Sequence, residues 1–101
     1  EVPWSMQVPI VVLGFAILDW RFGYLDSLFV HHAHQGCGIG AALLDGVEKL
    51  ARRYRLEYLV TDASVTAEPF FRARGFRRVR RQKRIYRGQV FRQYRMSKIL
   101  R

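Results

Sequence analysis

The sequence predicts a single α/β (α+β) domain, residues 1–101, with a mixed, mostly antiparallel sheet and helices on its faces. Three observations predict it. Apolar, β-branched and aromatic stretches of strand length recur along the chain. Residues 38–54 carry apolar side chains at helical spacing. Half of the 101 residues are hydrophobic, which is enough for one compact core.

The first half of the chain contains three predicted strands and the longest predicted helix. The strands cover about residues 2–7, 11–19 and 24–30. Alternation along the third strand places Tyr24, Asp26, Leu28 and Val30 on one face of the sheet, and Leu25, Ser27 and Phe29 on the other. The helix at about 38–54 has its apolar stripe at Ile39, Leu43, Val47, Leu50 and Tyr54.

The second half continues with a strand, a short helix and a hairpin. We expect a strand at about 57–62, a helix at about 66–74 that stops at Gly75, and strands at about 76–86 and 89–99. A helix between neighbouring strands favours a parallel pair, whereas the hairpins favour antiparallel pairs. The sheet is therefore predicted to be mixed.

Charge is unevenly distributed along the chain. The formal net charge is +10, made up of −3 in residues 1–50 and +13 in residues 51–101. Such a surface attracts polyanions: nucleic acid, acidic lipid or a phosphorylated cofactor. No apolar run is long enough for a membrane span, so no membrane partner is expected. A single cysteine, Cys37, cannot form an internal disulfide, which fits a reducing cytoplasm.

A glycine-rich run opens the long helix directly after a strand. Gln35, Gly36 and Gly38 precede the helical stripe, and Gly40 follows its first residue, Ile39. Glycine lets the backbone approach a ligand closely, and the unpaired N–H groups of a helix start favour anions. The spacing fits neither the dinucleotide-binding fingerprint nor the P-loop. The nearby His31, His32 and His34 have no matching acidic residue or cysteine at metal-ligand spacing in the sequence, so no metal site is predicted.

Five segments, in order, resemble the GNAT superfamily of acetyl-CoA-dependent N-acetyltransferases. They are residues 26–31, 35–44, 61–64, 67–76 and 94–98, within about residues 11–99. Relative to that family, the usual N-terminal strand and two helices are not seen ahead of the matched stretch. The resemblance therefore implies an N-terminally truncated acyl-CoA N-acyltransferase fold. Either the sequence is a fragment, or a neighbouring subunit of a homo-oligomer supplies the missing wall of the acceptor pocket, or that pocket is open; a truncated sheet edge favours the homo-oligomer.

The resemblance also implies a binding site for acetyl-CoA as co-substrate. Backbone amides of the glycine-rich run would hold the pyrophosphate, and the backbone of Phe29 and Val30 would pair with the pantetheine arm. Ser64, Ala67 and Phe71 would line the other side of that arm. The residues implied in the run are Gln35, Gly36, Cys37, Gly38, Ile39 and Gly40.

The implied reaction is direct attack of a primary amine on the thioester, in a ternary complex. Asp26 resembles the position of a family base, and Tyr24, two residues earlier, is the next candidate. The family's usual tyrosine position on the second helix reads Phe71, which has no proton to give. The thiolate would then be protonated by water, Tyr94 or Tyr86.

Two other functions remain open on the sequence. One is a non-catalytic CoA-binding or assembly protein, because of Phe71. The other is a basic nucleic-acid-binding module using Arg77–Arg84, which is less favoured because that segment lacks interleaved aromatic residues for base stacking. The acceptor, a small-molecule or peptide amine, is not identified by the sequence.

Overall fold

The computed structural model describes residues 14–31, 35–36 and 38–100. The strand predicted at 2–7, the start of the one predicted at 11–19, and Cys37 lie outside the described residues. The described elements follow one another as β1 (Gly14–Asp19), β2 (Tyr24–Val30), α1 (Ile39–Arg53), β3 (Tyr58–Ser64), α2 (Glu68–Ala73), β4 (Arg77–Tyr86) and β5 (Gln89–Ile99).

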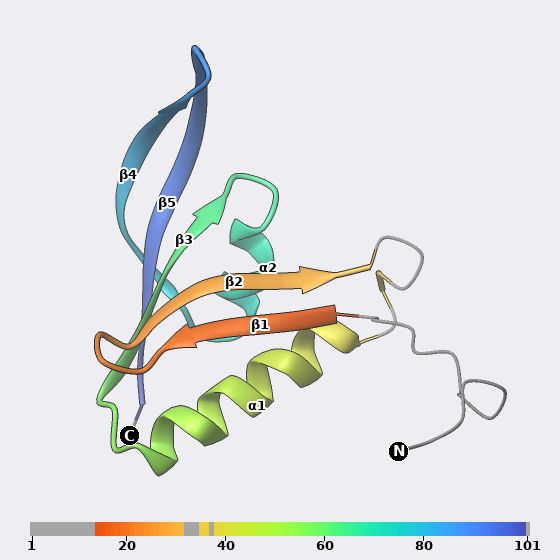
Figure 1. Cartoon of the computed structure of the whole chain (residues 1–101), viewed down its shortest axis with the longest axis vertical. Helices are drawn as coiled ribbons and strands as arrows, with labels where there is room; N and C mark the ends of the chain where they lie inside the picture. Colours follow the sequence, from red (N-terminus) through yellow and green to blue (C-terminus); the bar gives the residue numbers. More distant parts are fainter. Residues whose placement is uncertain (1–13, 32–34, 37, 101) are drawn as a thin grey trace, which may run out of the picture.

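These strands form one five-stranded sheet with the order β1-β2-β3-β5-β4 (Figure 1). β1 and β2 are antiparallel, as are β3 and β5, and β4 and β5. Only β2 and β3 run parallel among the described strands, and α1 connects them, as a parallel pair requires. The predicted mixed, mostly antiparallel sheet is confirmed.

The parallel pair is short, and this determines the shape of the sheet. β2 and β3 pair only at Tyr24 with Val60 and at Leu25 with Thr61, after which the two strands diverge (Figure 1). β3 instead pairs with β5 along its whole length. We call the wedge between the diverging strands the β2–β3 opening.

A β-bulge in the β1–β2 pair corrects the predicted facing of β2. Ile17 lies opposite Ser27, but Leu18 lies opposite Leu25, so the register skips Asp26. The alternation of β2 shifts at this point. Leu25, Leu28 and Val30 face the helices, while Tyr24, Asp26 and Phe29 face the other way. The prediction that Leu28 and Val30 share a face with Tyr24 and Asp26 is wrong, because strict alternation does not survive an extra residue.

Both helices pack on the same face of the sheet (Figure 1). Their side chains share one core with the strands, built from Leu44, Val47 and Ala51 of α1, Phe71 of α2, and Leu25, Leu59, Ala63, Phe76, Met96 and Leu100. The sequence predicted helices on the faces of the sheet but did not predict which face each helix covers. The opposite face, which we call the open face, carries no helix among the described residues.

Two buried glutamates tie the helices to the strands behind them. Glu48 of α1 accepts a hydrogen bond from Lys98 Nζ at 2.9 Å, and Glu68 of α2 accepts one from Arg78 Nε at 2.6 Å. Each carboxylate also has a longer ion pair to the arginine one helical turn further on, Arg52 at 3.7 Å from Glu48 and Arg72 at 3.4 Å from Glu68, so removing Lys98 or Arg78 would leave a buried carboxylate with only that weaker contact. These contacts hold both helices in register with β4 and β5. None of the helices in the described part of the chain has the length and hydrophobicity needed to cross a bilayer.

Candidate functional site

A pocket of about 560 Å³ lies where the start of α1, the end of β2 and α2 meet. It adjoins the β2–β3 opening, because β2 contributes to both. Its lining combines apolar side chains with glycine backbone and a single guanidinium. The lining residues are Leu28, Val30, Gln35, Gly36, Gly38, Gly40, Ala41, Ala67, Phe70, Phe71 and Arg74.

Glycine is required at the mouth of this pocket. Gly36 and Gly38 have φ of 84° and 81°, a left-handed conformation that other residues adopt at a cost. A Cβ at either position would meet nothing within 4 Å, so the backbone is uncovered there. At Gly40, a Cβ would lie 3.3 Å from the Phe70 ring, so a side chain would crowd the contact between α1 and α2.

The helix start supplies donors to the same place. Gly38 precedes α1, and its carbonyl accepts the first helical hydrogen bond, from Ala42 N–H at 3.0 Å. The N–H groups of the first turn therefore have no helical acceptor, and no side chain caps them. Such a helix start is suited to a phosphate or pyrophosphate group.

The structure gathers most of the predicted cofactor residues around this pocket. Those that line it are Val30, Gln35, Gly36, Gly38, Gly40, Ala67 and Phe71. Three other predicted residues lie elsewhere. The Phe29 ring stacks on Phe15 at 5.3 Å on the open face, Ile39 packs toward β1 at Gly14, and Ser64 Oγ accepts the Ala67 N–H at 3.1 Å before α2.

Sequence reasoning missed four lining residues: Leu28, Ala41, Phe70 and Arg74. Arg74 is the charged member of the lining. Its guanidinium lies 4.2 Å from the centroid of the Phe70 ring, and Nη1 donates to the Phe70 carbonyl at 3.4 Å. The spacing of Phe70 and Arg74, one helical turn apart, was a signal for this pairing.

The β2–β3 opening presents unpaired backbone to the pocket. Beyond Leu25 and Thr61, the facing edges of β2 and β3 do not bond to each other. The closed end is fastened by Thr61 Oγ1, which donates to the buried Leu25 carbonyl at 2.9 Å. An extended chain entering the opening can therefore pair with free N–H and C=O groups, as an added strand does.

The three predicted catalytic residues are not brought together. Tyr24 and Asp26 lie on the open face, near the closed end of the opening. Tyr94 lies on the helix-covered face of β5, with the Arg78 guanidinium 4.2 Å from its ring centroid. Asp26 is exposed and makes no hydrogen bond or ion pair with another described residue.

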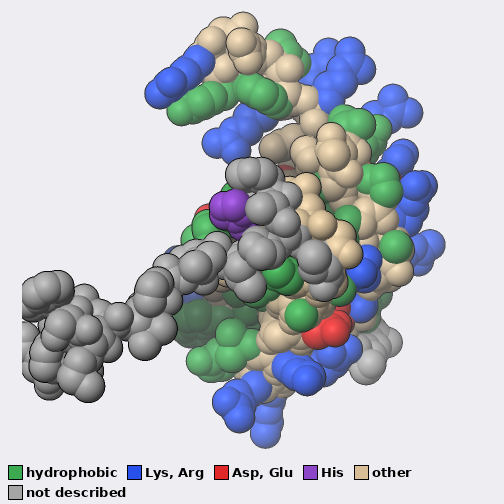
Figure 2. All heavy atoms as spheres, turned by 90° about the vertical axis from the view of Figure 1, so that its right-hand side faces the viewer, with side chains coloured by type: hydrophobic (Ala, Val, Ile, Leu, Met, Phe, Trp, Pro, Cys, Tyr) green, Lys and Arg blue, Asp and Glu red, His purple; other side chains and the backbone are tan. Residues whose placement is uncertain are grey.

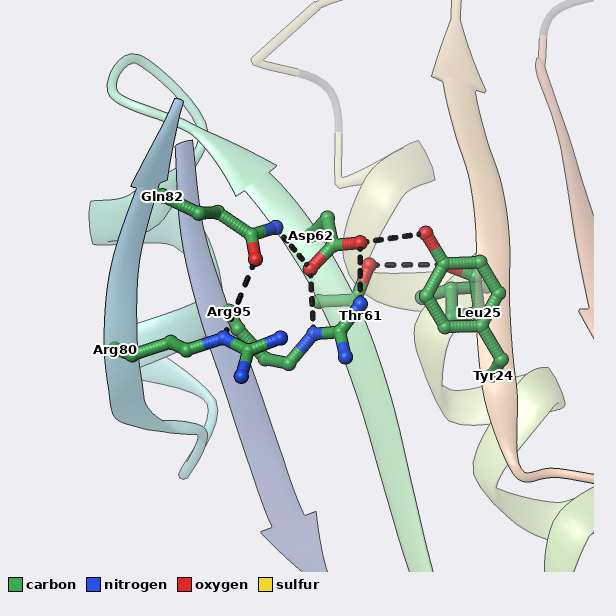
Figure 3. A network of polar contacts seen from close by, with 7 residues as sticks. All are labelled: Tyr24, Leu25, Thr61, Asp62, Arg80, Gln82 and Arg95. Carbon is green, nitrogen blue, oxygen red and sulfur yellow. Dashed lines mark hydrogen bonds and ion pairs between the residues drawn. The ribbon is translucent and has the colours of Figure 1, made fainter. Parts of the chain in front are cut away.

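Asp62 is the centre of a polar network that the sequence did not indicate (Figure 3). Arg95 grips its carboxylate with two hydrogen bonds, from Nε at 2.9 Å and from Nη2 at 3.0 Å. Tyr24 Oη donates to the carboxylate at 2.8 Å, and Gln82 Nε2 donates at 2.7 Å. The network joins β2, β3, β4 and β5 across the open face.

Electrostatics assign fixed protonation states within this network. The hydrogen bonds from Arg95 hold the pKa of Asp62 below its ordinary value. Burial, with the nearby Asp62 carboxylate, raises the pKa of Tyr24. Asp62 therefore stays ionised and Tyr24 stays protonated, which makes both poor bases at neutral pH. No group of three or more His, Cys, Asp or Glu with metal-binding geometry is found among the described residues, a set that leaves out His32 and His34.

A family model described as "Acetyltransferase (GNAT) domain" matches residues 4–98. The chain belongs to this family. This GNAT chain is 38% identical, over 68 residues, to the uncharacterized N-acetyltransferase YafP of Escherichia coli, a match that covers 67% of this chain and 42% of that protein.

Solved structures agree with the family assignment. A GCN5-related N-acetyltransferase (Aminotransferase, Class-II) from Rhodopseudomonas palustris superimposes with a TM-score of 0.83 at 33% identity, covering 89% of this chain and 56% of that one. The putative acetyltransferase yncA of Salmonella typhimurium, with its cofactor acetyl-CoA, gives a TM-score of 0.71 at 25% identity, covering 90% and 60%. The GNAT chain thus spans 42% to 60% of the lengths of these relatives.

Proposed function

We propose that the protein binds acetyl-CoA and transfers its acetyl group to a primary amine by direct attack in a ternary complex. One observation carries the proposal: in a GNAT chain, a helix start without a side-chain cap and an opening between two strands lie side by side at one pocket. The structure of yncA with its cofactor acetyl-CoA supports the choice of ligand.

The described residues fit an elongated anionic thioester. Backbone N–H groups around Gly36, Gly38 and Gly40 would hold the pyrophosphate. The edge of β2 at Phe29 and Val30 would pair with the pantetheine arm, with Ala67 and Phe71 on its other side. Arg74 adds a positive charge at the pocket, which suits a polyphosphorylated ligand.

Asp26 is our choice of base. The amine must lose a proton to attack, and Asp26 is an exposed carboxylate beside the opening with no hydrogen-bond partner among the described residues. The Phe29 or Val30 N–H would donate to the carbonyl oxygen as it gains charge. Bound acetyl-CoA supplies the electrophilic carbonyl. Because Phe71 cannot donate a proton, the departing thiolate would take its proton from water.

Exchange of one glycine tests the cofactor site. Gly38→Ala should weaken acetyl-CoA binding at least about tenfold, because the added Cβ would occupy the open space over the backbone in which the pyrophosphate would bind. The measurement is calorimetric titration of folded protein. Gly88→Ala is the matched control, since Gly88 has a similar φ of 74°, an equally open Cβ position, and lies in the hairpin turn.

Titration outcomes separate the candidate functions. Equal affinities in both variants and the parent would contradict the site. Binding without release of free thiol on addition of amines would favour a non-catalytic CoA-binding or assembly protein. Absence of CoA binding, with salt-sensitive binding of RNA or DNA, would favour a nucleic-acid-binding module.

The remaining assignments are part of the same proposal. The acceptor is a small-molecule or peptide amine, and the protein acts in the cytoplasm, where its lone Cys37 would stay reduced. We infer a homo-oligomer from the open face, where Phe15, Ile17 and Phe29 are 44%, 50% and 46% exposed.

A further inference from the structure

The β4–β5 hairpin projects beyond the rest of the sheet (Figure 1). β3, the neighbour of β5, ends at Ser64, which lies opposite Gln93. Past that point β4 and β5 continue as residues 83–86 and 89–92, joined by a turn, and we call residues 83–92 the free ribbon. At about 3.3 Å per residue, it is ~13 Å long. No residue of the hairpin lines the pocket at the start of α1, so the cofactor site does not use this part of the molecule.

The charge on the hairpin has a single sign. Residues 69–101 contain no Asp or Glu. Six cations of the hairpin are exposed and form no ion pair with a described acidic residue, unlike Arg78 and Arg95 nearer the core. The six are Arg80, Arg81, Lys83, Arg84, Arg87 and Arg92. Figure 2 shows Lys and Arg side chains to either side of the hairpin, at the top of the view.

Two of the six cations lie on the open face of the hairpin. Gln82 points to that face, because its amide donates to the Asp62 carboxylate at 2.7 Å. Successive residues of a strand alternate between faces, and the β4–β5 register is regular from Arg80 to the turn. Arg80 and Arg84 therefore share the open face with Gln82.

Three other cations lie on the opposite face. Alternation puts Arg81 and Lys83 there, and Lys83 pairs directly with Arg92 of β5. Like charges directly opposite each other destabilise a strand pair. This face therefore has a cost in the free protein that contact with an anion would remove.

Protection of the sheet edge does not account for this pattern. β4 is an edge strand, and charged side chains on an edge prevent unwanted strand pairing. Charges of either sign would serve that purpose, and mixed signs would avoid repulsion between the two strands. A hairpin with six cations and no acidic residue instead matches a partner with dense negative charge.

Cations on both faces favour a groove over a flat surface. An acidic membrane would contact one face of the free ribbon or its end, and would leave the other cations without partners. In B-form DNA, phosphates flank both sides of the major groove, which is about 12 Å wide and admits a two-stranded ribbon. The deep, narrow major groove of duplex RNA does not. Base stacking, which single strands use, is not needed for phosphate contacts to a duplex.

We propose that the free ribbon binds duplex DNA by entering its major groove turn-first. The groove is about 8.5 Å deep, less than the ~13 Å of free ribbon, so the rest of the sheet stays outside it. Lys83, Arg84 and Arg92 contact phosphates on the two sides of the groove, and Arg87 adds a charge at the turn. Such contacts carry little sequence information. This function is additional to the proposed acetyl transfer and does not depend on it.

Fluorescence anisotropy of the whole protein tests the proposal, with a labelled DNA duplex of about 20 base pairs, two turns of the helix. Four phosphate contacts predict a slope of about −3.6 in log K against log salt, which is a loss of roughly 150-fold in affinity between about 50 and 200 mM salt. The unlabelled competitors are the same duplex, duplex RNA of that sequence, single-stranded DNA, vesicles of phosphatidylserine and phosphatidylcholine in equal parts, and polyglutamate. The DNA duplex should compete about tenfold better than any other.

A double variant tests the position of the contact. Lys83→Gln, Arg92→Gln removes one cation from each strand and relieves the repulsion between them, so the fold is retained. It should flatten the salt slope by about 1.8 and weaken DNA binding at least about tenfold near 50 mM salt. Lys49→Gln, Arg53→Gln is the matched control, because it removes the same charges from exposed positions on α1 that form no ion pair with a described residue. It should keep the affinity of the parent protein to within about twofold.

The other outcomes count against the proposal. No binding to duplex DNA at low salt, or a salt slope that Lys83→Gln, Arg92→Gln leaves unchanged, would overturn it. Equal losses of affinity in the two double variants would mean that net charge alone attracts DNA. A competitor that equals or exceeds the DNA duplex would assign the free ribbon to that partner instead. Affinity for acetyl-CoA should be the same in the parent and in both double variants, so failure of the cofactor site is detected separately.

Discussion

At the scale of the residue, Asp62 shows how a side chain gains importance from its neighbours. It sits between Thr61 and Ala63 on β3, both of which are buried on the helix side, so alternation sends its carboxylate to the open face. There it receives Arg95 from β5, Tyr24 from β2 and Gln82 from β4. Together with the Thr61 bond to Leu25, it fastens the strands at the point where β2 and β3 separate.

Stability should depend on pH through Asp62. Its pKa is lowered in the folded state, so the ionised form contributes stability above about pH 4, and this contribution is lost as pH falls through the lower folded-state value. Unfolding by urea should therefore show Asp62→Asn clearly less stable than the parent near pH 7, with the gap narrowing toward about pH 3. Tyr24, Asp26, Arg80 and Arg95 are the charged or titratable groups around it.

Asp45→Asn provides the comparison for Asp62. Asp45 is exposed on α1 and lies outside the network, so Asp45→Asn should have about the same free energy of unfolding as the parent at both ends of the pH range. A difference in the free energy of unfolding between Asp62→Asn and the parent that stays constant with pH would contradict this pH dependence.

At the scale of the element, the close approach of β1 and β2 depends on a missing side chain. A Cβ on Gly14 would lie 2.6 Å from the Phe29 carbonyl oxygen and 3.0 Å from Leu43 Cδ1 of α1. Gly14 therefore allows α1 to lie close across the β1–β2 pair, which positions the helix start beside the end of β2. The bulge between Ile17 and Leu18 bends the same pair.

Gly14→Ala should lower the free energy of unfolding by about 1–3 kcal/mol, because backbone must move to admit the methyl group. Gly46→Ala is the counterpart within α1. Gly46 is exposed in the helix with nothing within 4 Å of its Cβ position, so alanine should stabilise by roughly 0.5–1 kcal/mol. Urea unfolding measures both, and the same sign for the two variants would contradict the packing argument.

At the scale of the whole molecule, one face of the sheet is covered and the other is open. Both helices pack on one side, whereas the open face carries Phe15, Ile17 and Phe29 next to one another, with the first and last rings stacked. An apolar group of this kind on a sheet face favours association with another surface.

Sedimentation velocity tests whether a second copy covers this face. The parent should associate as its concentration rises, and the pair Phe15→Gln, Ile17→Gln should remain monomeric over the same range, because the apolar contact is lost. Ile85→Gln is the control, since Ile85 is 74% exposed on the hairpin, away from that face. A parent protein that is monomeric over the whole concentration range would contradict the proposed homo-oligomer.

The sequence by itself determined most of the described elements and the position of the glycine-rich loop. Helical spacing after Gly38, the helix between two strands and the turn at Arg87-Gly88 are local signals, and local backbone preferences survive folding. Seven of the predicted cofactor residues line the pocket because five of them are neighbours along the chain, from Val30 through Gly40.

Only the tertiary structure decided how those elements meet. The register of the strands determines where β2 separates from β3, and it determines which face Phe29 and Tyr94 occupy. It also brings Tyr24 and Arg95 to Asp62. The bulge in the β1–β2 pair matters because one extra residue reverses the facing of the residues that follow it in the strand. The meeting of Leu28, Ala41 and Arg74 in one pocket escaped sequence reasoning for the same reason. These three residues are far apart along the chain, and only folding brings them to the same pocket.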